Sequence, residues 1–184
     1  MTSKNKSLLT RRRLLQAGAA ASLSLAIAPR AVFAATPERS LSFYNLHTGE
    51  SLNATFWADG GYVPAALTDI NHVLRDFRTD QVMAIDPKLL DLLFALRGQM
   101  DTKDPFHVIS GYRSPATNAM LHEHSSGVAA KSFHTKGMAI DINLPDRSLS
   151  DLHRVALSMA AGGVGYYPSS DFVHVDTGPV RRWG

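Results

Sequence analysis

Apolar side chains recur at helical spacing in four segments of the chain. They repeat every three or four positions in residues 63–77, which predicts an amphipathic helix. Residues 86–100 open with Asp86 and Pro87, a typical N-cap followed by proline at the first helical position, and continue with the leucines of a buried helix. Two further helices are predicted over residues 114–127 and 150–163, the second ending at paired glycines.

Strand-like segments lie between and after these helices. Residues 41–57 read as two strands joined by a turn at Gly49, and residues 106–110 and 138–143 read as single strands. Residues 164–176 predict a hairpin with a proline-containing turn. Because helices come early and strands cluster late, we predict an α+β fold, a single compact domain with an antiparallel sheet flanked by helices.

The strand at residues 138–143 ("MAIDIN") carries a charge in an apolar run. Side chains alternate between the two faces of a strand, so Ile140 and Ile142 share the core face and Asp141 lies on the other. A carboxylate in such a run is costly unless it is paired or bound to something. In residues 171–176 ("DFVHVD") the same alternation places the two valines on the core face and His174 on the other face. His174 could therefore lie close to Asp141.

A third candidate ligand precedes this strand. His134 lies in the loop seven residues before Asp141 and can fold back towards it. His134, Asp141 and His174, with an open fourth position, would form the ligand set of a catalytic zinc site, although the same ligands suit other divalent ions. The absence of cysteine excludes a closed thiolate site. The other histidines are predicted to be surface or hydrogen-bonded residues: His47, His72, His107, His122, His124 and His153.

The N-terminal segment has the pattern of a secretory signal. Residues 1–34 have a basic start, an apolar middle too short to span a membrane, and small residues at the end. Residues 10–16 ("TRRRLLQ") resemble a twin-arginine signal. We therefore expect cleavage after Ala34, export by the twin-arginine machinery to the periplasm, no stable membrane insertion afterwards, and a mature domain over residues 35–184.

Removal of this segment changes the charge of the protein. Residues 1–34 hold six of the 19 basic residues and no acid, so the mature chain keeps 13 basic and 16 acidic residues, a net charge of −3. A nucleic-acid-binding domain carries a basic stripe, and binding to nucleic acid is therefore not expected.

An arginine occupies the predicted strand-to-helix junction "SGYRS" (residues 110–114). Arg113 keeps its charge and presents several donors in a fork. Beside a zinc site it would stabilise a developing oxyanion or hold a substrate carboxylate. The alternative is a structural ion pair at the start of the helix.

Three motifs together resemble the zinc peptidases of the D-Ala-D-Ala carboxypeptidase family, and within it the murein endopeptidases. They are "SGYRS", "SFHTKGMAID" (residues 132–141) and "DFVHVD", and the resemblance covers most of the chain. It implies the fold of that family, one Zn²⁺ and peptidoglycan peptides as substrate. By position it implies His134, Asp141 and His174 as zinc ligands, and Arg113 at the transition state.

The first two motifs also supply candidate substrate contacts. These are Tyr112, beside Arg113, and Ser132, at the start of the second motif. Tyr166 and Tyr167 are further candidates for the cleft. Packing in the core is the alternative for each of the three tyrosines.

One position departs from the family pattern. Many members carry a glutamate three residues before the last histidine as general base, and here that residue is Asp171, one methylene shorter. Strand alternation would turn Asp171 away from His174 unless the preceding turn bends it back. Asp171 is our predicted base. Asp176, or activation of water without a protein base, is the alternative, and Asp171 would otherwise cap the turn.

These observations predict a periplasmic zinc endopeptidase that cleaves peptide cross-links of peptidoglycan. The resemblance alone implies the bond between two meso-diaminopimelate residues. One alternative is a D,D- or L,D-carboxypeptidase that trims stem peptides, with Arg113, Lys131 or Lys136 as carboxylate clamp. The other is a cell-wall-binding module without catalysis, because a fold does not fix a function.

Overall fold

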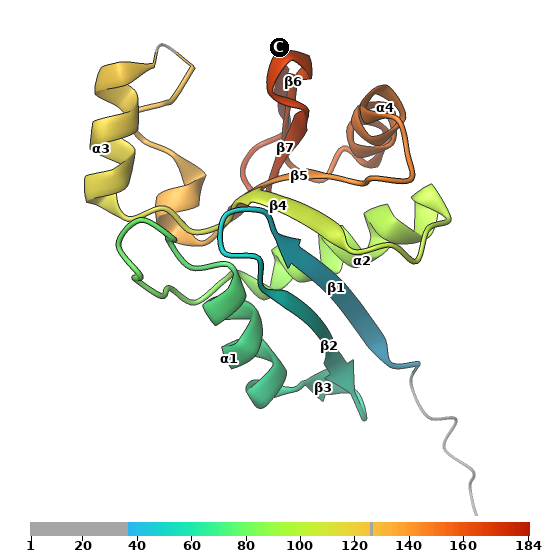
Figure 1. The fold of residues 1–184 in the computed structure, drawn as a ribbon. Coiled ribbons are helices and arrows are strands. Elements are labelled where there is room, and N and C mark those ends of the chain that lie inside the picture. The colour runs from blue at the N-terminus through green and yellow to red at the C-terminus, as the bar shows by residue number, and fades with distance from the viewer. Residues whose placement is uncertain (1–36, 126) are drawn as a thin grey trace, which may run out of the picture. The chain divides into compact units, whose positions relative to one another are not determined.

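A mixed sheet of eight strands organises the part of the chain that the computed structural model describes, residues 37–125 and 127–184 (Figure 1). The strand order is β3-β2-β1-β4-β5-β7-β6-β8. The strands are β1 (Arg39–Asn45), β2 (Ser51–Ala58), β3 (Gly61–Tyr62), β4 (Phe106–Ser110), β5 (Ala139–Asn143), β6 (Gly163–Tyr167), β7 (Phe172–Asp176) and β8 (Arg181–Trp183). The predicted signal, residues 1–34, lies outside the described residues.

The predicted α+β fold is confirmed, and the sheet has two parallel pairs that the sequence did not indicate. The pairs β1–β4 and β6–β8 are parallel, and the other five are antiparallel. A parallel pair needs a long connection, and between β1 and β4 the chain includes two helices. Local periodicity predicts strands without naming their neighbours, so this pairing could not be predicted.

In the described part of the chain, four α-helices accompany the sheet: α1 (Pro64–Val73), α2 (Pro87–Met100), α3 (Pro115–His124) and α4 (Leu149–Met159). The predicted caps of two are confirmed, since Asp86 accepts from the Lys88 N–H at 3.0 Å and Ser114 from the Thr117 N–H at 3.2 Å. The last helix ends at Met159, earlier than the predicted paired glycines.

The hydrophobic core lies between the sheet and three of these helices, with Ala66, Ile70 and Val73 of α1 packed on β2. The α2 helix packs on β1 and α4, and α4 packs on β6 and β7. Leu93 of α2 and Ile140 and Val173 of the sheet are fully buried. The predicted alternation in β5 is confirmed, because Ile140 and Ile142 face this core and leave Asp141 for the opposite face. Across residues 37–125 and 127–184, no helix combines the length and apolar character needed to cross a membrane.

Candidate metal centre

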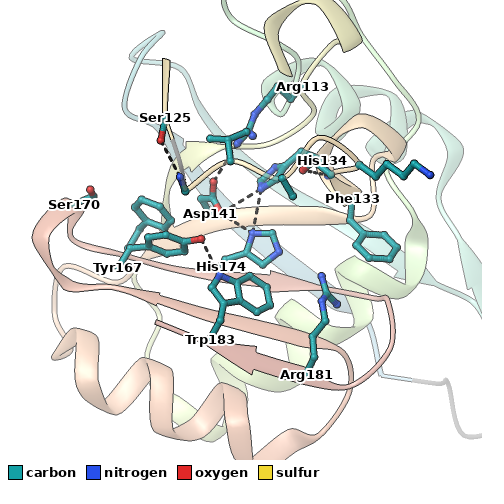
Figure 2. A pocket seen from close by; sticks show the side chains of 16 residues that line it. Arg113, Ser125, Phe133, His134, Asp141, Tyr167, Ser170, His174, Arg181 and Trp183 are labelled. Carbon is teal, nitrogen blue, oxygen red and sulfur yellow. Dashed lines mark hydrogen bonds and ion pairs between the residues drawn. The ribbon is translucent and has the colours of Figure 1, made fainter. Parts of the chain in front are cut away.

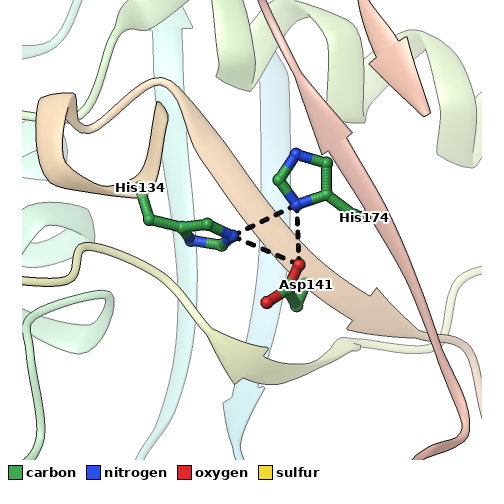
Figure 3. Close-up of side chains that lie close together, drawn as sticks. All are labelled: His134, Asp141 and His174. Carbon is green, nitrogen blue, oxygen red and sulfur yellow. Dashed lines mark hydrogen bonds and ion pairs between the residues drawn. The ribbon is translucent and has the colours of Figure 1, made fainter. Parts of the chain in front are cut away.

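Three side chains from separate segments converge on one point (Figure 3). His134 comes from the short 3-10 helix η2 (Phe133–Lys136), and Asp141 and His174 face each other across the antiparallel pair β5–β7. His134 Nε2 lies 3.2 Å from Asp141 Oδ1 and 3.1 Å from His174 Nδ1, which is 2.8 Å from the same carboxylate oxygen. All three residues are buried. The structure therefore brings together the three predicted ligands.

Local features of η2 place the first ligand. Ser132 caps this helix by accepting a hydrogen bond from the His134 N–H at 3.3 Å. Gly137 ends it in the left-handed region at φ 66°, where a Cβ would lie 2.3 Å from the Ala84 carbonyl oxygen. Only glycine fits this close approach.

The outward ring nitrogens of both histidines have fixed acceptors. His134 Nδ1 lies 2.7 Å from the Gly111 carbonyl oxygen, and His174 Nε2 lies 2.9 Å from Asp176 Oδ2. A proton on each outward nitrogen leaves the inward nitrogens free to bind a metal, which is the usual outer arrangement of metal-binding histidines. A tetrahedral zinc site has ligand atoms about 3.4 Å apart, close to the spacing found here. The residues therefore fit zinc.

The electrostatics of the centre suit a cation. Burial opposes ionisation of Asp141, but His134 and His174 outweigh it and hold the pKa of the carboxyl well below its usual range. Burial likewise opposes protonation of His174, but Asp141 and Asp176 outweigh it and raise its pKa to about 9. An ionised carboxylate thus holds the centre in the absence of metal, and a bound cation would displace a proton from His174.

Arg113 lies beside this centre with donor capacity to spare (Figure 2). Its Nη2 is 3.5 Å from Asp141 Oδ2. Its side-chain hydrogen bonds to Asn118 and Ser110 are both long, at 3.4 Å, and within the described chain its Nε has no partner although it is buried. A guanidinium with unfilled donors at a pocket wall is suited to bind an incoming oxygen atom.

Asp76, which the sequence did not single out, fixes the segment that carries Arg113. Its Oδ2 accepts from the Ser114 N–H at 2.8 Å, and two residues earlier the Tyr112 N–H donates to the Leu74 carbonyl at 2.7 Å. Asp76 is buried, and no sequence motif identifies it, because its contact with the Ser114 N–H joins residues 38 positions apart in the chain.

The centre opens into a pocket of about 320 Å³ (Figure 2). Three cationic side chains line it, those of Arg113, Lys131 and Arg181, and among the described lining residues Asp141 is the only acid. A pocket with this charge favours substrates that carry carboxylates.

Comparison with known proteins also indicates an enzyme that acts on peptidoglycan peptides. A family model described as peptidoglycan L,D-endopeptidase MepK matches residues 33–183. The chain belongs to this family. It is 50% identical over 176 residues to peptidoglycan L,D-endopeptidase MepK of Escherichia coli K12, covering 94% of this chain and 96% of that protein. It is 42% identical over 177 residues to the probable peptidoglycan L,D-endopeptidase MepK of Haemophilus influenzae, covering 94% and 95%. The predicted resemblance to murein endopeptidases is confirmed.

The predicted substrate contacts of this family member lie in different surroundings. Ser132 lines the pocket. Tyr112 is 6% exposed, packs in the hydrophobic core and is not among the lining residues. The alternative of core packing therefore describes Tyr112, because it faces away from its neighbour Arg113. Tyr167 lines the pocket instead.

The two candidate bases also differ in their surroundings. Asp171 lies at the turn before β7 with φ 53°, and its Oδ2 accepts from Asn143 Nδ2 at 3.1 Å. It is exposed and does not line the pocket, so the structure does not bring it to the metal ligands. Asp176 is fully buried and holds the outward nitrogen of His174, which leaves it in a positioning role.

The C-terminal strand β8 supplies pocket residues that the sequence did not indicate. Arg181 forms a two-pronged ion pair with Asp176 at 3.0 and 2.6 Å, and its guanidinium carbon lies 5.0 Å from the ring centroids of both Phe133 and Trp183. Arg181 thus fixes the Asp176 carboxylate, which in turn orients the His174 ring. Its signal in the sequence is only the short run "RRW", which no periodicity marks as a strand.

Proposed function

We propose that the protein is a zinc-dependent endopeptidase that hydrolyses peptide cross-links of peptidoglycan. The observation that carries this proposal is the convergence of His134, Asp141 and His174 in a cationic pocket. The relatives' name, L,D-endopeptidase, supports a bond between an L and a D centre. We assign the bond between two meso-diaminopimelate residues, which has this stereochemistry.

The metal ligands and Arg113 divide the chemistry between them. His134, Asp141 and His174 would hold the zinc ion, while Gly111 and Asp176 orient the two imidazoles. When bound, zinc supplies Lewis acidity, which strengthens water as a nucleophile and a carbonyl carbon as an electrophile. Arg113 donates to the carbonyl oxygen of the scissile amide and stabilises the negative charge that develops there.

The charge of the pocket supports the assigned bond. In a diaminopimelate cross-link, the carbon attached to the scissile nitrogen also carries a free carboxylate. Lys131 and Arg181 line the pocket with Arg113, and Lys131 is exposed. A cationic side chain near the metal centre would bind that carboxylate by a charge-assisted hydrogen bond.

Asp171, the predicted general base, lies outside the residues that line the pocket. Asp171 would have to release Asn143, which donates to both its carbonyl and its carboxylate oxygen, and turn into the pocket. Asp141, the only lining acid in the described residues, is a metal ligand. Activation of water without a separate protein base therefore fits the geometry better than a base at Asp171.

The location of the enzyme follows from the same hypothesis. Peptidoglycan is its substrate, and residues 1–34 have the pattern of a twin-arginine signal. We therefore propose export by the twin-arginine machinery to the periplasm. A fusion of residues 1–34 to a fluorescent reporter, with and without Arg11→Lys and Arg12→Lys, would test this by the dependence of export on that machinery.

The central experiment uses purified peptidoglycan fragments cross-linked through two diaminopimelate residues. Wild-type protein should convert the dimers to monomers, a chelator should stop the reaction, and added zinc should restore it. His174→Ala should be inactive throughout. Mass spectrometry of the products identifies the broken bond. Release of a single terminal residue would instead indicate a carboxypeptidase, and binding without cleavage would indicate a cell-wall-binding module.

A further inference from the structure

The wall of the pocket that belongs to β6, β7 and β8 carries an ordered phenol. Tyr167 lines the pocket and its ring stacks on Phe172, with centroids 4.5 Å apart and planes 21° apart. The Trp183 Nε1–H donates to the Tyr167 hydroxyl oxygen at 2.8 Å (Figure 2). Stacking fixes the ring, and the indole fixes the oxygen.

This hydrogen bond determines the role of the hydroxyl. An indole N–H is only a donor, so the Tyr167 oxygen must be the acceptor and its own hydrogen is left to donate elsewhere. Within residues 37–125 and 127–184, no protein acceptor receives that hydrogen. The pocket therefore has an oriented O–H donor that the fold itself does not use.

The donor belongs to the same wall as one metal ligand, His174. The Trp183 ring centroid lies 5.2 Å from that of His174. Gly165 pairs with His174 across β6 and β7, and a Cβ there would come within 2.6 Å of the Trp183 ring. The indole therefore packs directly beside the ligand and reaches from it to Tyr167. In Figure 2, Tyr167 lies on the opposite side of Asp141 from Arg113.

We propose that Tyr167 is a catalytic residue that donates a hydrogen bond to the reacting amide of the substrate. This inference rests on the proposed peptidase function. Arg113 approaches the carbonyl oxygen from one wall, and the Tyr167 hydroxyl approaches from the other as negative charge develops on that oxygen. No proton is transferred, and Trp183 acts as a positioning residue that directs the phenol.

The direct test removes only the hydroxyl. Tyr167→Phe should lower kcat on the cross-linked fragment about 100-fold, the typical effect of losing one oxyanion donor, with KM changed less than about twofold. Zinc affinity, measured by competition with a chelating indicator, should equal that of wild type. This second readout separates a catalytic donor from damage to the metal centre.

The neighbouring tyrosine provides a matched control. Tyr166 stacks on His153 with centroids 4.5 Å apart and is not a lining residue, so Tyr166→Phe should keep wild-type kcat. Trp183→Phe keeps an aromatic ring but removes the N–H that orients the phenol. It should lower kcat less than Tyr167→Phe does, and adding it to Tyr167→Phe should cause little further loss.

The outcomes separate this proposal from the proposed function. If wild type is active and Tyr167→Phe has the same kcat, the role of Tyr167 is overturned and the proposed peptidase function still stands. A raised KM with unchanged kcat would overturn it too, because the hydroxyl would then bind substrate without favouring the transition state. An inactive wild type loaded with zinc would overturn the proposed function and this role with it.

Discussion

Asp76 and Asp141 are two buried carboxylates with opposite kinds of partner. Asp76 is 2% exposed and Asp141 is 5% exposed. Asp76 accepts from the backbone N–H groups of Ser114 and Arg78, at 2.8 and 3.0 Å. Asp141 faces only side chains, those of two histidines and an arginine. Backbone N–H groups thus hold both oxygens of the first carboxylate, whereas the second carboxylate lies among side chains alone.

This difference distinguishes a structural charge from a functional one. Burial disfavours ionisation of Asp76, yet hydrogen bonds from Ser114, Thr117 and Arg78 outweigh it and lower the pKa to about 2. Its contribution is to fix the segment before α3. In the Asp141 cluster a carboxylate oxygen and the inward ring nitrogens of His134 and His174 converge on one point. Such a set of atoms can bind a metal ion once the proton on His174 is displaced.

The largest effect, on zinc affinity and hydrolysis, should come from removing the Asp141 carboxylate. Asp141→Ala removes one of three metal ligands, and zinc affinity should fall by about 1,000-fold or more, about 4 kcal/mol. Hydrolysis of cross-linked fragments should fall to background. Competition with a chelating indicator measures the affinity. Asp151→Ala, an exposed carboxylate paired with Arg154, is the control and should bind zinc as wild type does. Tight zinc binding by Asp141→Ala would contradict the assigned ligand set.

Replacement of Asp76 should instead lower the stability of the fold and leave zinc affinity almost unchanged. Asp76→Ala leaves the buried N–H of Ser114 and the part-buried N–H of Arg78 without their acceptor, and the free energy of unfolding should fall by about 3 kcal/mol. Zinc affinity should change less than about threefold, since no ligand is removed. Urea denaturation measures the first quantity. Asp80→Asn, which removes an exposed charge beside Arg75 and keeps a side chain that tolerates the φ of 60° there, should cost less than about 1 kcal/mol. A large loss of zinc affinity in Asp76→Ala would erase the distinction between the two carboxylates.

A smaller effect should appear in the acid dependence of stability. The pKa of Asp76 is about 2 when folded, against 3.8 for the free group. Its stabilising contribution is complete above the unfolded value and is lost as pH falls through the folded one. The difference in unfolding free energy between wild type and Asp76→Asn should therefore shrink by about 2 kcal/mol between pH 5 and pH 2. Denaturation of the two chelator-treated proteins across this range measures it. A constant difference would show that Asp76 does not titrate in this way.

The same comparison explains what the sequence could predict. His134, Asp141 and His174 could be found because Asp141 places a charge in the otherwise apolar run of β5 and because the motifs of the family are local. The α2 helix and its cap were predicted for the same reason, since Asp86 and Pro87 adjoin the leucines that they precede. Asp76 carries no such signal, because its partner Ser114 lies 38 residues away in the chain. The parallel strand β8 and the role of Arg181 likewise depend on tertiary pairing.

Replacement of Asp171 should have the smallest effect on kcat, and it tests whether this carboxylate is structural, as Asp76 is, or takes part in catalysis. It is exposed and held by Asn143, so Asp171→Ala should change kcat less than about threefold, whereas loss of a general base would cost about 100-fold or more. Asn143→Ala is the matched variant, because it releases the Asp171 carboxylate without removing it. If Asp171 acts as base after turning into the pocket, Asn143→Ala should keep or raise kcat while Asp171→Ala abolishes it. The geometry predicts that both variants keep a kcat close to that of wild type. Neither the Asp171 carboxylate nor the Asn143 amide reaches the metal ligands.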